Sequence, residues 1–236
     1  MRIDRFLTTS VLFLLTMSAA ISFWAQQSES MSPTSAYQTA LSLAPFRSIE
    51  LSGGGKAILR YGPVQHVTLL KGGTNYTEVN IVGDHLVIEK CRERCPRGYQ
   101  LEVEIVAPDI AGISIADGGT IEVRGSFPGR EEIIVAVSDG GAIDIRSLTV
   151  ESVTASVNQG GVIFTKPQSV LIASVRQGGN ITYWGDPRIT SSIKNGGVVT
   201  KGASDDVDKP FSDFGSLFHA TPPIPPVPPI PPVQDN

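Results

Sequence analysis

Cysteine, histidine and clustered positive charge are all scarce in this sequence. It has two cysteines and three histidines among 236 residues, and its formal net charge is −4. No run of Lys and Arg is long enough to follow a phosphate backbone, so we expect no nucleic-acid partner. The scattered histidines belong to no zinc or nucleophile signature. The sequence therefore predicts a protein that is not an enzyme and needs no metal or cofactor.

Helical apolar periodicity is also missing outside the N-terminal region. Strand-forming residues dominate the middle of the chain, and the sequence contains 24 glycines. Both features favour an all-β core.

The N-terminus has the features of an export signal. Arg2 and Arg5 precede an apolar run from Phe6 to Ala25 with small residues near its end, which is typical of a secretory signal peptide. We therefore expect 1–25 to be a signal peptide and the protein to be exported to the periplasm or the cell surface. The alternative is an uncleaved single-span anchor, because about 20 residues just cross a bilayer. No cysteine follows the run, which argues against a lipid anchor there, and we expect no other membrane contact.

The two cysteines lie close together, at Cys91 and Cys95, with Pro96 next. In an oxidising compartment such a pair predicts a disulfide that closes a tight loop. A redox pair and half of a metal site are the competing interpretations. The redox motif has two intervening residues and not three, and no other cysteine or nearby histidine completes a metal shell.

Composition shifts divide the rest of the chain into three parts. Residues 26–45 are rich in Ser, Thr, Gln and Ala and are expected to be a linker. The body spans 46–202, and an acidic and Pro-rich tail follows over 203–236. Within this tail the prolines of 221–233 predict a polyproline II rod. The rod is either a spacer or a ligand for an aromatic-lined groove.

Gly-Gly pairs mark a repeat in the second half of the body. Five pairs follow one another at intervals of 22, 20, 18 and 18 residues, and self-similarity near 20 residues is typical of stacked coils. The pairs are Gly118-Gly119, Gly140-Gly141, Gly160-Gly161, Gly178-Gly179 and Gly196-Gly197. Three residues before them stand Ile115, Val137, Val157, Val175 and Ile193, and two residues after them stand Ile121, Ile143, Ile163, Ile181 and Val199.

Each repeat predicts a strand, a glycine corner and a second strand. A two-residue hairpin would set Ile115 opposite Glu122, whereas a chain that bends without reversing keeps the apolar residues on one face. Glycines at such a bend accept left-handed dihedrals and place no Cβ against the next coil, ~4.8 Å away. We therefore expect an all-β, single-stranded parallel β-helix, or solenoid, of about 20-residue coils. Three-residue loops would permit an antiparallel meander, which remains the alternative.

The first part of the body is less regular. Residues 46–108 alternate in the same way, but the Gly-Gly pairs that begin at Gly53 and Gly72 are followed by no other pair until Gly118. We expect irregular first coils and a cap that covers the open end of the solenoid.

These motifs resemble a known family. The segments Ser-Asp-Gly-Gly-Ala-Ile-Asp-Ile (138–145), Leu-Glu-Val-Glu-Ile-Val-Ala-Pro (101–108) and Ile-Thr-Tyr-Trp-Gly-Asp-Pro (181–187) look like the head-GIN domain family of "putative autotransporter adhesins". The resemblance covers about 46–187 and implies a right-handed parallel β-helix behind an export signal, with a largely undefined role. One departure is that a Pro-rich tail, and not a membrane-barrel segment, follows the repeats.

Two aspartates are the candidate polar site. Asp117 and Asp139 each precede a Gly-Gly pair, so they should lie ~5 Å apart on adjacent coils, the separation of a retaining glycosidase pair. The column continues as Gln159, Gln177 and Asn195, which favours a structural ladder of stacked corners. A cation site and catalysis remain alternatives. The Gly-Gly-x-Gly-x-Asp calcium repeat is absent, which weakens the first of these.

The outward faces are the other candidate sites. Before the corners, the outward positions are small or polar and become basic in the last two coils: Ser114, Ala116, Ala136, Ser138, Ser156, Asn158, Ser174, Arg176, Ser192 and Lys194. They form either a solvated face or a docking surface for a glycan or another sheet. After the corners the column runs Glu122, Asp144, Phe164 and Thr182, with Tyr183 and Trp184 nearby.

The aromatic residues near the end of the repeats have two interpretations. Phe164, Tyr183 and Trp184 suit sugar stacking, and they equally suit a seam beneath the segment 211–218, which has three phenylalanines. We favour the seam. The sequence as a whole predicts a non-enzymatic binding or adhesion module of the cell envelope, with a glycan or an envelope protein as its partner. A carbohydrate-active enzyme and a purely structural periplasmic protein are the alternatives.

Overall fold

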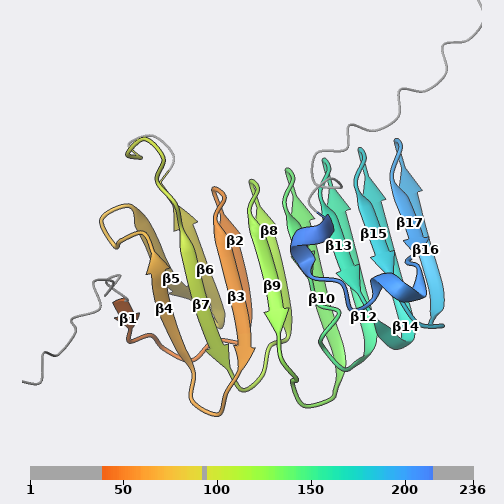
Figure 1. Ribbon diagram of the computed structural model, residues 1–236, viewed down its shortest axis with the longest axis horizontal. Coiled ribbons are helices and arrows are strands. Elements are labelled where there is room, and N and C mark those ends of the chain that lie inside the picture. The colour runs from red at the N-terminus through yellow and green to blue at the C-terminus, as the bar shows by residue number, and fades with distance from the viewer. Residues whose placement is uncertain (1–38, 92–94, 215–236) are drawn as a thin grey trace, which may run out of the picture. The chain divides into compact units, whose positions relative to one another are not determined.

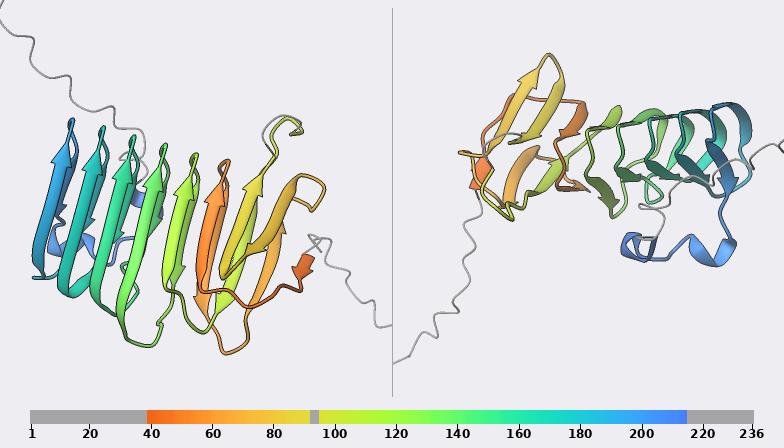
Figure 2. Two further views of the ribbon diagram at one scale, coloured as in Figure 1. Left: turned by 180° about the vertical axis from the view of Figure 1, so that it is seen from behind. Right: turned by 90° about the horizontal axis from the view of Figure 1, so that it is seen from above.

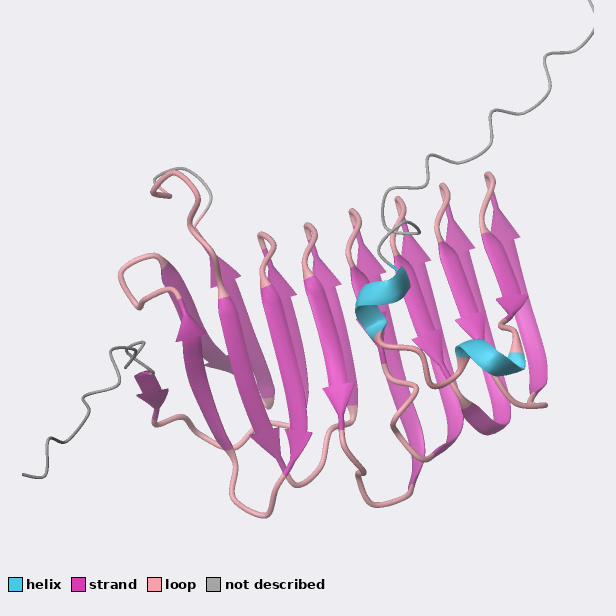
Figure 3. Cartoon of the chain, viewed as in Figure 1, coloured by secondary structure: helices cyan, strands magenta, loops and turns pink. Residues whose placement is uncertain are grey.

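The computed structural model describes residues 39–91 and 95–214 (Figure 1). The predicted signal peptide over 1–25 and the Pro-rich segment 221–233 lie outside these residues. The described part is all-β apart from the short 3₁₀ turn η1 (Ser204–Asp206) and a second 3₁₀ stretch over 211–214 (Figure 3). None of the helical structure described is long and apolar enough to cross a membrane.

The strands form two mixed sheets that face each other across the core and do not close into a barrel (Figure 2). The nine-stranded sheet has the order β1 (Thr39–Leu41), β4 (His66–Lys71), β7 (Glu102–Ala107), β3 (Lys56–Tyr61), β9 (Thr120–Arg124), β11 (Ala142–Asp144), β13 (Val162–Thr165), β15 (Asn180–Tyr183), β17 (Val198–Lys201). The eight-stranded sheet has the order β16 (Arg188–Lys194), β14 (Pro167–Arg176), β12 (Val150–Asn158), β10 (Arg130–Ser138), β8 (Gly112–Ala116), β2 (Ser48–Ser52), β6 (His85–Lys90), β5 (Thr77–Val82).

The strand register aligns the residues that flank the glycine corners in continuous columns. Ile115 pairs with Val137, Val137 with Val157, and the same column continues in parallel pairing through β14 and β16. The column after the corners runs in the same way from Ile121 to Val199. The strands on either side of a corner lie in different sheets, so the corners are not hairpins and the meander alternative is wrong.

The alternation of side chains explains why these units stack. In β8 and β9 the odd-numbered residues are buried and the even-numbered residues face outward. Each strand–corner–strand unit therefore contributes apolar residues to one shared core between the two sheets, and the core continues from unit to unit. A single unit has no partner for its inner face, so stacking is what buries it.

The corners use glycine for two different reasons. Gly160 and Gly161 both have positive φ, 87° and 104°, a region that favours glycine. A Cβ on Gly160 would meet nothing within 4 Å, whereas one on Gly161 would lie 2.4 Å from Val137 Cγ1 and 3.1 Å from the oxygen of Gly141. The second glycine of the pair is thus also required by the close approach of the preceding unit. All ten corner glycines have positive φ except Gly197.

The N-terminal part departs from the chain order of the repeats. The unit formed by β2 and β3 lies between the unit of β6 and β7 and the unit of β8 and β9. Beyond β6 and β7, strands β5 and β4 pair antiparallel with them, and β1 pairs antiparallel with β4. The N-terminal part is therefore irregular, as expected, and ends in antiparallel strands.

Three details of the sequence-based description need correction. The corner of β2 and β3 is formed by Gly53 to Gly55, but the Gly72 pair joins β4 to β5 and lies against the loop between β6 and β7, next to Tyr99. β1 lies inside the predicted linker 26–45, and Leu41 and Leu43 pack against the core. The body also continues past residue 202, because Phe211 is buried at 7% exposure.

Candidate functional site

The column that begins with Asp117 and Asp139 lies on the exposed side of the corners. Asp117, Asp139, Gln159, Gln177 and Asn195 all have positive φ, between 52° and 65°, which Asn and Asp tolerate better than most residues. Main-chain bonds tie these corners together, since Asp117 N donates to Ser138 O and Asp139 N donates to Asn158 O. The two aspartates are thus neighbours on adjacent units, as predicted, and main-chain hydrogen bonds join their units there.

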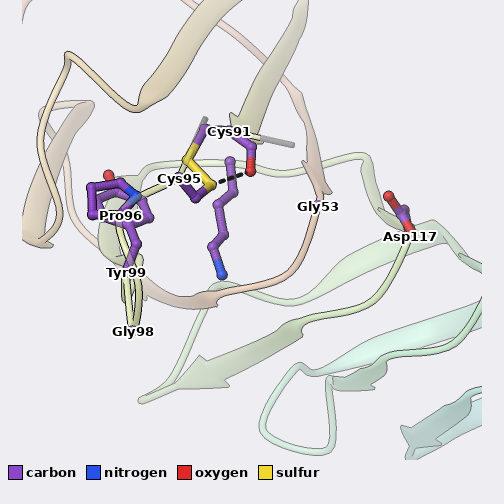
Figure 4. A pocket seen from close by; sticks show the side chains of 8 residues that line it. Gly53, Cys91, Cys95, Pro96, Gly98, Tyr99 and Asp117 are labelled. Carbon is purple, nitrogen blue, oxygen red and sulfur yellow. Dashed lines mark hydrogen bonds between the residues drawn. A yellow bond between two sulfur atoms is a disulfide. The ribbon is translucent and has the colours of Figure 1, made fainter. Parts of the chain in front are cut away.

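Asp117 also borders a pocket that the sequence did not suggest. The pocket has a volume of about 560 Å³. It lies between the corner of β2 and β3, the corner of β8 and β9 and the loop after β6 (Figure 4). Its lining residues are Gly53, Lys90, Cys91, Cys95, Pro96, Gly98, Tyr99 and Asp117. Only the stacking of β6 and β7 on β2 and β3 brings these residues together, and the sequence contains no signal for that stacking.

The predicted disulfide is present at the rim of this pocket. Cys91 and Cys95 are bonded to each other and are not free thiols, so the interpretation as half of a metal site is not supported. Nearby, Tyr99 anchors the loop, because its hydroxyl lies 2.6 Å from Thr77 Oγ1 and accepts a hydrogen bond from Gly73 N at 3.0 Å. The disulfide closes the loop on itself, and the tyrosine holds it against β5 and the turn before β5.

The aromatic residues proposed for ligand stacking are mostly buried. Phe164 is 0% exposed and Trp184 is 3% exposed, because residues 203–214, here called the C-terminal strap, cover them. The ring of Phe164 lies 5.9 Å from that of Phe211 and 4.8 Å from that of Phe214, measured between centroids. The seam beneath the C-terminal segment is thus confirmed, and Phe164 and Trp184 offer no ring face to a glycan in this structure. Phe218 lies outside the described residues.

Tyr183 also differs from its predicted role. It lies at an inward position of β15, between Thr165 and Lys201 in the register, and it packs against the core. Tyr183 is partly buried, and it lies near the C-terminal end of the core and not on the outer face of a sheet.

An arginine anchors the strap. Arg146 and Asp144 are both 7% exposed and form an ion pair, with Nη2 2.7 Å from Asp144 Oδ2. The same guanidinium donates to the oxygens of Asp206, Val207 and Lys209 in the strap. Its central carbon lies 4.8 Å from the ring centroid of Phe214, within the range of a cation–π interaction.

This anchor could not be recognised from the sequence. Asp144 and Arg146 stand at outward positions of a strand and its exit, which usually means a solvated pair. Burial comes from the strap, which supplies carbonyl acceptors for a guanidinium that has five donors. A further bond, from Trp184 Nε1 to Ala203 O at 2.8 Å, fixes the start of the strap.

The outer face of the eight-stranded sheet remains open. No described segment crosses it, because the strap covers the opposite sheet (Figure 2). Two isoleucines lie among its small and polar residues: Ile134 is 55% exposed and Ile172 is 46% exposed, with Thr154 between them in the register. This row was not predicted from the sequence, although even-numbered residues face outward in strands whose odd-numbered residues are buried. Among the described residues, no three His, Cys, Asp or Glu side chains group together to hold a metal ion.

Comparisons with known proteins agree with the resemblance seen in the sequence. Residues 45–136 match the family model described as "Putative auto-transporter adhesin, head GIN domain", a shorter range than the 46–187 inferred above. No protein in the curated set matches the chain.

Several solved structures are similar. One is a "putative adhesin" from Bacteroides fragilis, at 17% identity and a TM-score of 0.47, with 70% of this chain and 94% of that chain covered. A "putative adhesin" from Parabacteroides distasonis has 13% identity and a TM-score of 0.43, with 70% and 96% covered. A "putative lipid binding protein" from the same organism has 13% identity and a TM-score of 0.38, again with 70% and 96% covered.

Proposed function

Because residues 45–136 match the head GIN domain family, we propose that this protein is an exported, non-enzymatic module that binds at the cell envelope or cell surface, in an adhesion-like role. We further propose that the stacked units form a right-handed β-solenoid. The parallel register of five successive corners supports the solenoid. Export is supported by the apolar N-terminal run and by the disulfide, which persists in oxidising compartments.

The observation that carries the binding function is the open outer face of the eight-stranded sheet. This face is built on regularly paired strands, so its side chains are held in fixed rows. Ile134 and Ile172 supply exposed apolar area, and the serines around them supply hydrogen-bonding groups. A flat surface with this mixture suits a glycan or another flat protein surface, where affinity comes from a few apolar contacts surrounded by polar groups.

A glycan array and a pull-down from cell-envelope fractions test this proposal with the full chain. The double variant Ile134→Thr with Ile172→Thr should bind the glycan or envelope protein found in these assays at least about tenfold more weakly. The reason is that two exposed apolar side chains are removed from the contact. The matched control is Val64→Thr with Val198→Thr, two exposed valines that lie outside this sheet, which should bind like wild type.

The same glycans are then incubated with the protein and assayed for released reducing sugar. Release above the background of a heat-inactivated sample would contradict a non-enzymatic role and favour the carbohydrate-active alternative. Equal loss of binding in both double variants would move the site away from this sheet.

A further inference from the structure

The eight-stranded sheet ends in a strand with a bare edge. Within residues 39–91 and 95–214, β16 pairs with β14 on one side and with no strand on the other. Every residue of β16 is exposed. At the opposite end of the stack the same sheet ends in β5, which pairs antiparallel with β6 and among the described strands is likewise paired on one side only.

The hydrogen-bonding groups of this edge can be assigned from the register. Gln177 N donates to Lys194 O, so the main chain of Lys194 faces β14. Main-chain groups in a parallel strand alternate between the two neighbours. The N–H and C=O groups of Ile189, Ser191 and Ile193 therefore point to the open edge.

The side chains of β16 form a pattern that reads almost the same in both directions. Arg188 and Lys194 stand at its ends on the outward face, and Ile189 and Ile193 stand next to them at inward positions. The isoleucines are 38% and 47% exposed, although their counterparts in the preceding units are buried. An added strand would cover these two side chains and extend the core by one row.

The edge of the other sheet is protected against such pairing. In β17 the inward position next to Tyr183 is occupied by Lys201, whose Nζ lies 2.5 Å from Asp186 Oδ1. A charge at an inward edge position is a common device against strand addition, because pairing would bury it. β16 carries no charge at an inward position, so only one of the two edges is receptive.

A second copy of this chain fits the edge poorly. Antiparallel pairing of β16 with itself about Ser191 would align the isoleucines but would set Arg188 against Lys194 at both ends. Like charges directly opposite each other are destabilising. End-to-end contact would also bring Lys201 of each copy toward the interface. The charge pattern instead calls for acidic residues opposite Arg188 and Lys194.

We propose that the edge of β16 binds one extended peptide segment of another protein as an added β-strand. The segment carries acidic residues six positions apart, opposite Arg188 and Lys194, and an apolar residue immediately inside each of them, opposite Ile189 and Ile193. Because β16 is nearly symmetric, the same segment fits in either direction. Main-chain bonds supply the affinity and the alternating side chains supply the selectivity, as in other strand-addition complexes. The proposal concerns the edge, and it goes beyond the function assigned to the face of the sheet.

The probe is a labelled peptide, Gly-Ser-Glu-Ile-Thr-Ser-Thr-Ile-Glu-Gly-Ser, titrated into the full chain by fluorescence anisotropy. Saturable binding is expected, with slower amide exchange at Ile189, Ser191 and Ile193. A peptide with Lys in place of both Glu should bind at least about tenfold more weakly. Arg188→Glu with Lys194→Glu should reverse this preference. Arg97→Glu with Lys166→Glu, which makes the same change in net charge elsewhere, should not.

A proline substitution separates the edge from the fold. Ser191→Pro removes an N–H that points away from β14, so the thermal transition should stay close to that of wild type, whereas probe binding should fall at least about tenfold. Unchanged probe binding by Ser191→Pro would overturn the proposal.

The same experiments would also reveal two other possible occupants of the β16 edge. A wild-type dimer in light scattering that Ser191→Pro dissociates would replace the peptide by a second copy. Probe binding by a chain that ends at Phe214, with none by the full chain, would assign the edge to the protein's own C-terminal tail. Either result contradicts the proposal.

Discussion

Replacing Gly161 by valine tests the corner geometry most directly. Two costs combine in this variant. Holding a β-branched residue at φ 104° costs about 1–3 kcal/mol. The new Cβ would also lie 2.4 Å from Val137 Cγ1, a side chain that is only 1% exposed, and relief of such overpacking costs about 1–3 kcal/mol more. The total expected loss of unfolding free energy is about 2–6 kcal/mol.

Gly160→Val is the matched control. It introduces the same side chain at φ 87°, but its Cβ would meet nothing within 4 Å. It therefore has the backbone cost without the crowding, about 1–3 kcal/mol. For a body of this size, each kcal/mol lowers Tm by about 2–4 °C. The two variants differ by the crowding cost alone, so their melting temperatures should differ by roughly 2–12 °C in thermal unfolding followed by circular dichroism. Equal melting temperatures would show that the preceding unit does not approach the second glycine of the pair, and the account of the corners would be wrong.

Three further predictions follow from other parts of the molecule. The two cysteines should resist alkylation under denaturing, non-reducing conditions and react after reduction; two free thiols before reduction would contradict the disulfide. Arg146→Met should destabilise the body by about 2–4 kcal/mol, because Asp144 is left buried without its charge partner. Asp144→Asn combined with Arg146→Met should cost less than Arg146→Met alone, and a loosened strap should shift the emission of Trp184 to the red; an unchanged spectrum would argue against the anchor. Asp117→Asn with Asp139→Asn should hold or raise Tm because a pair of like charges is removed, whereas a calcium-dependent rise in the Tm of wild type that this double variant abolishes would favour a cation site.

The regular part of the fold could be predicted from the sequence because its signal is local and repeated. Ile115, Val137 and Val157 keep one offset from their glycines, and this offset is enough to place them in one column of the core. The position of β2 carries no such signal. Ile49 pairs with Ile113, and nothing in the spacing indicates that the chain passes over β6 and β7 before it returns to this strand.

The candidate sites were harder to predict for a related reason. Asp144 and Phe164 occupy outward positions, which usually face solvent, and only the strap turns them into buried residues. The three phenylalanines in 211–218 were enough to predict the seam. Nothing in the sequence indicated that Arg146 would hold the strap over it. The pocket beside the disulfide is formed by three segments that are distant in sequence, so it could not be predicted from the periodicity of the sequence.

The insertion of β2 and β3 between two later units has a consequence for the order of folding. As the chain becomes available from its N-terminus, β2 and β3 can pair with β6 and β7, but their other edges stay bare until β8 and β9 arrive. This half of the molecule must therefore close long loops before any of its interior is complete, which slows the first step. Each later unit joins a finished neighbour after a short connection and can add in sequence. Folding should thus divide into a slow closure around β2 and β3 and a faster, directional growth toward β16 and β17.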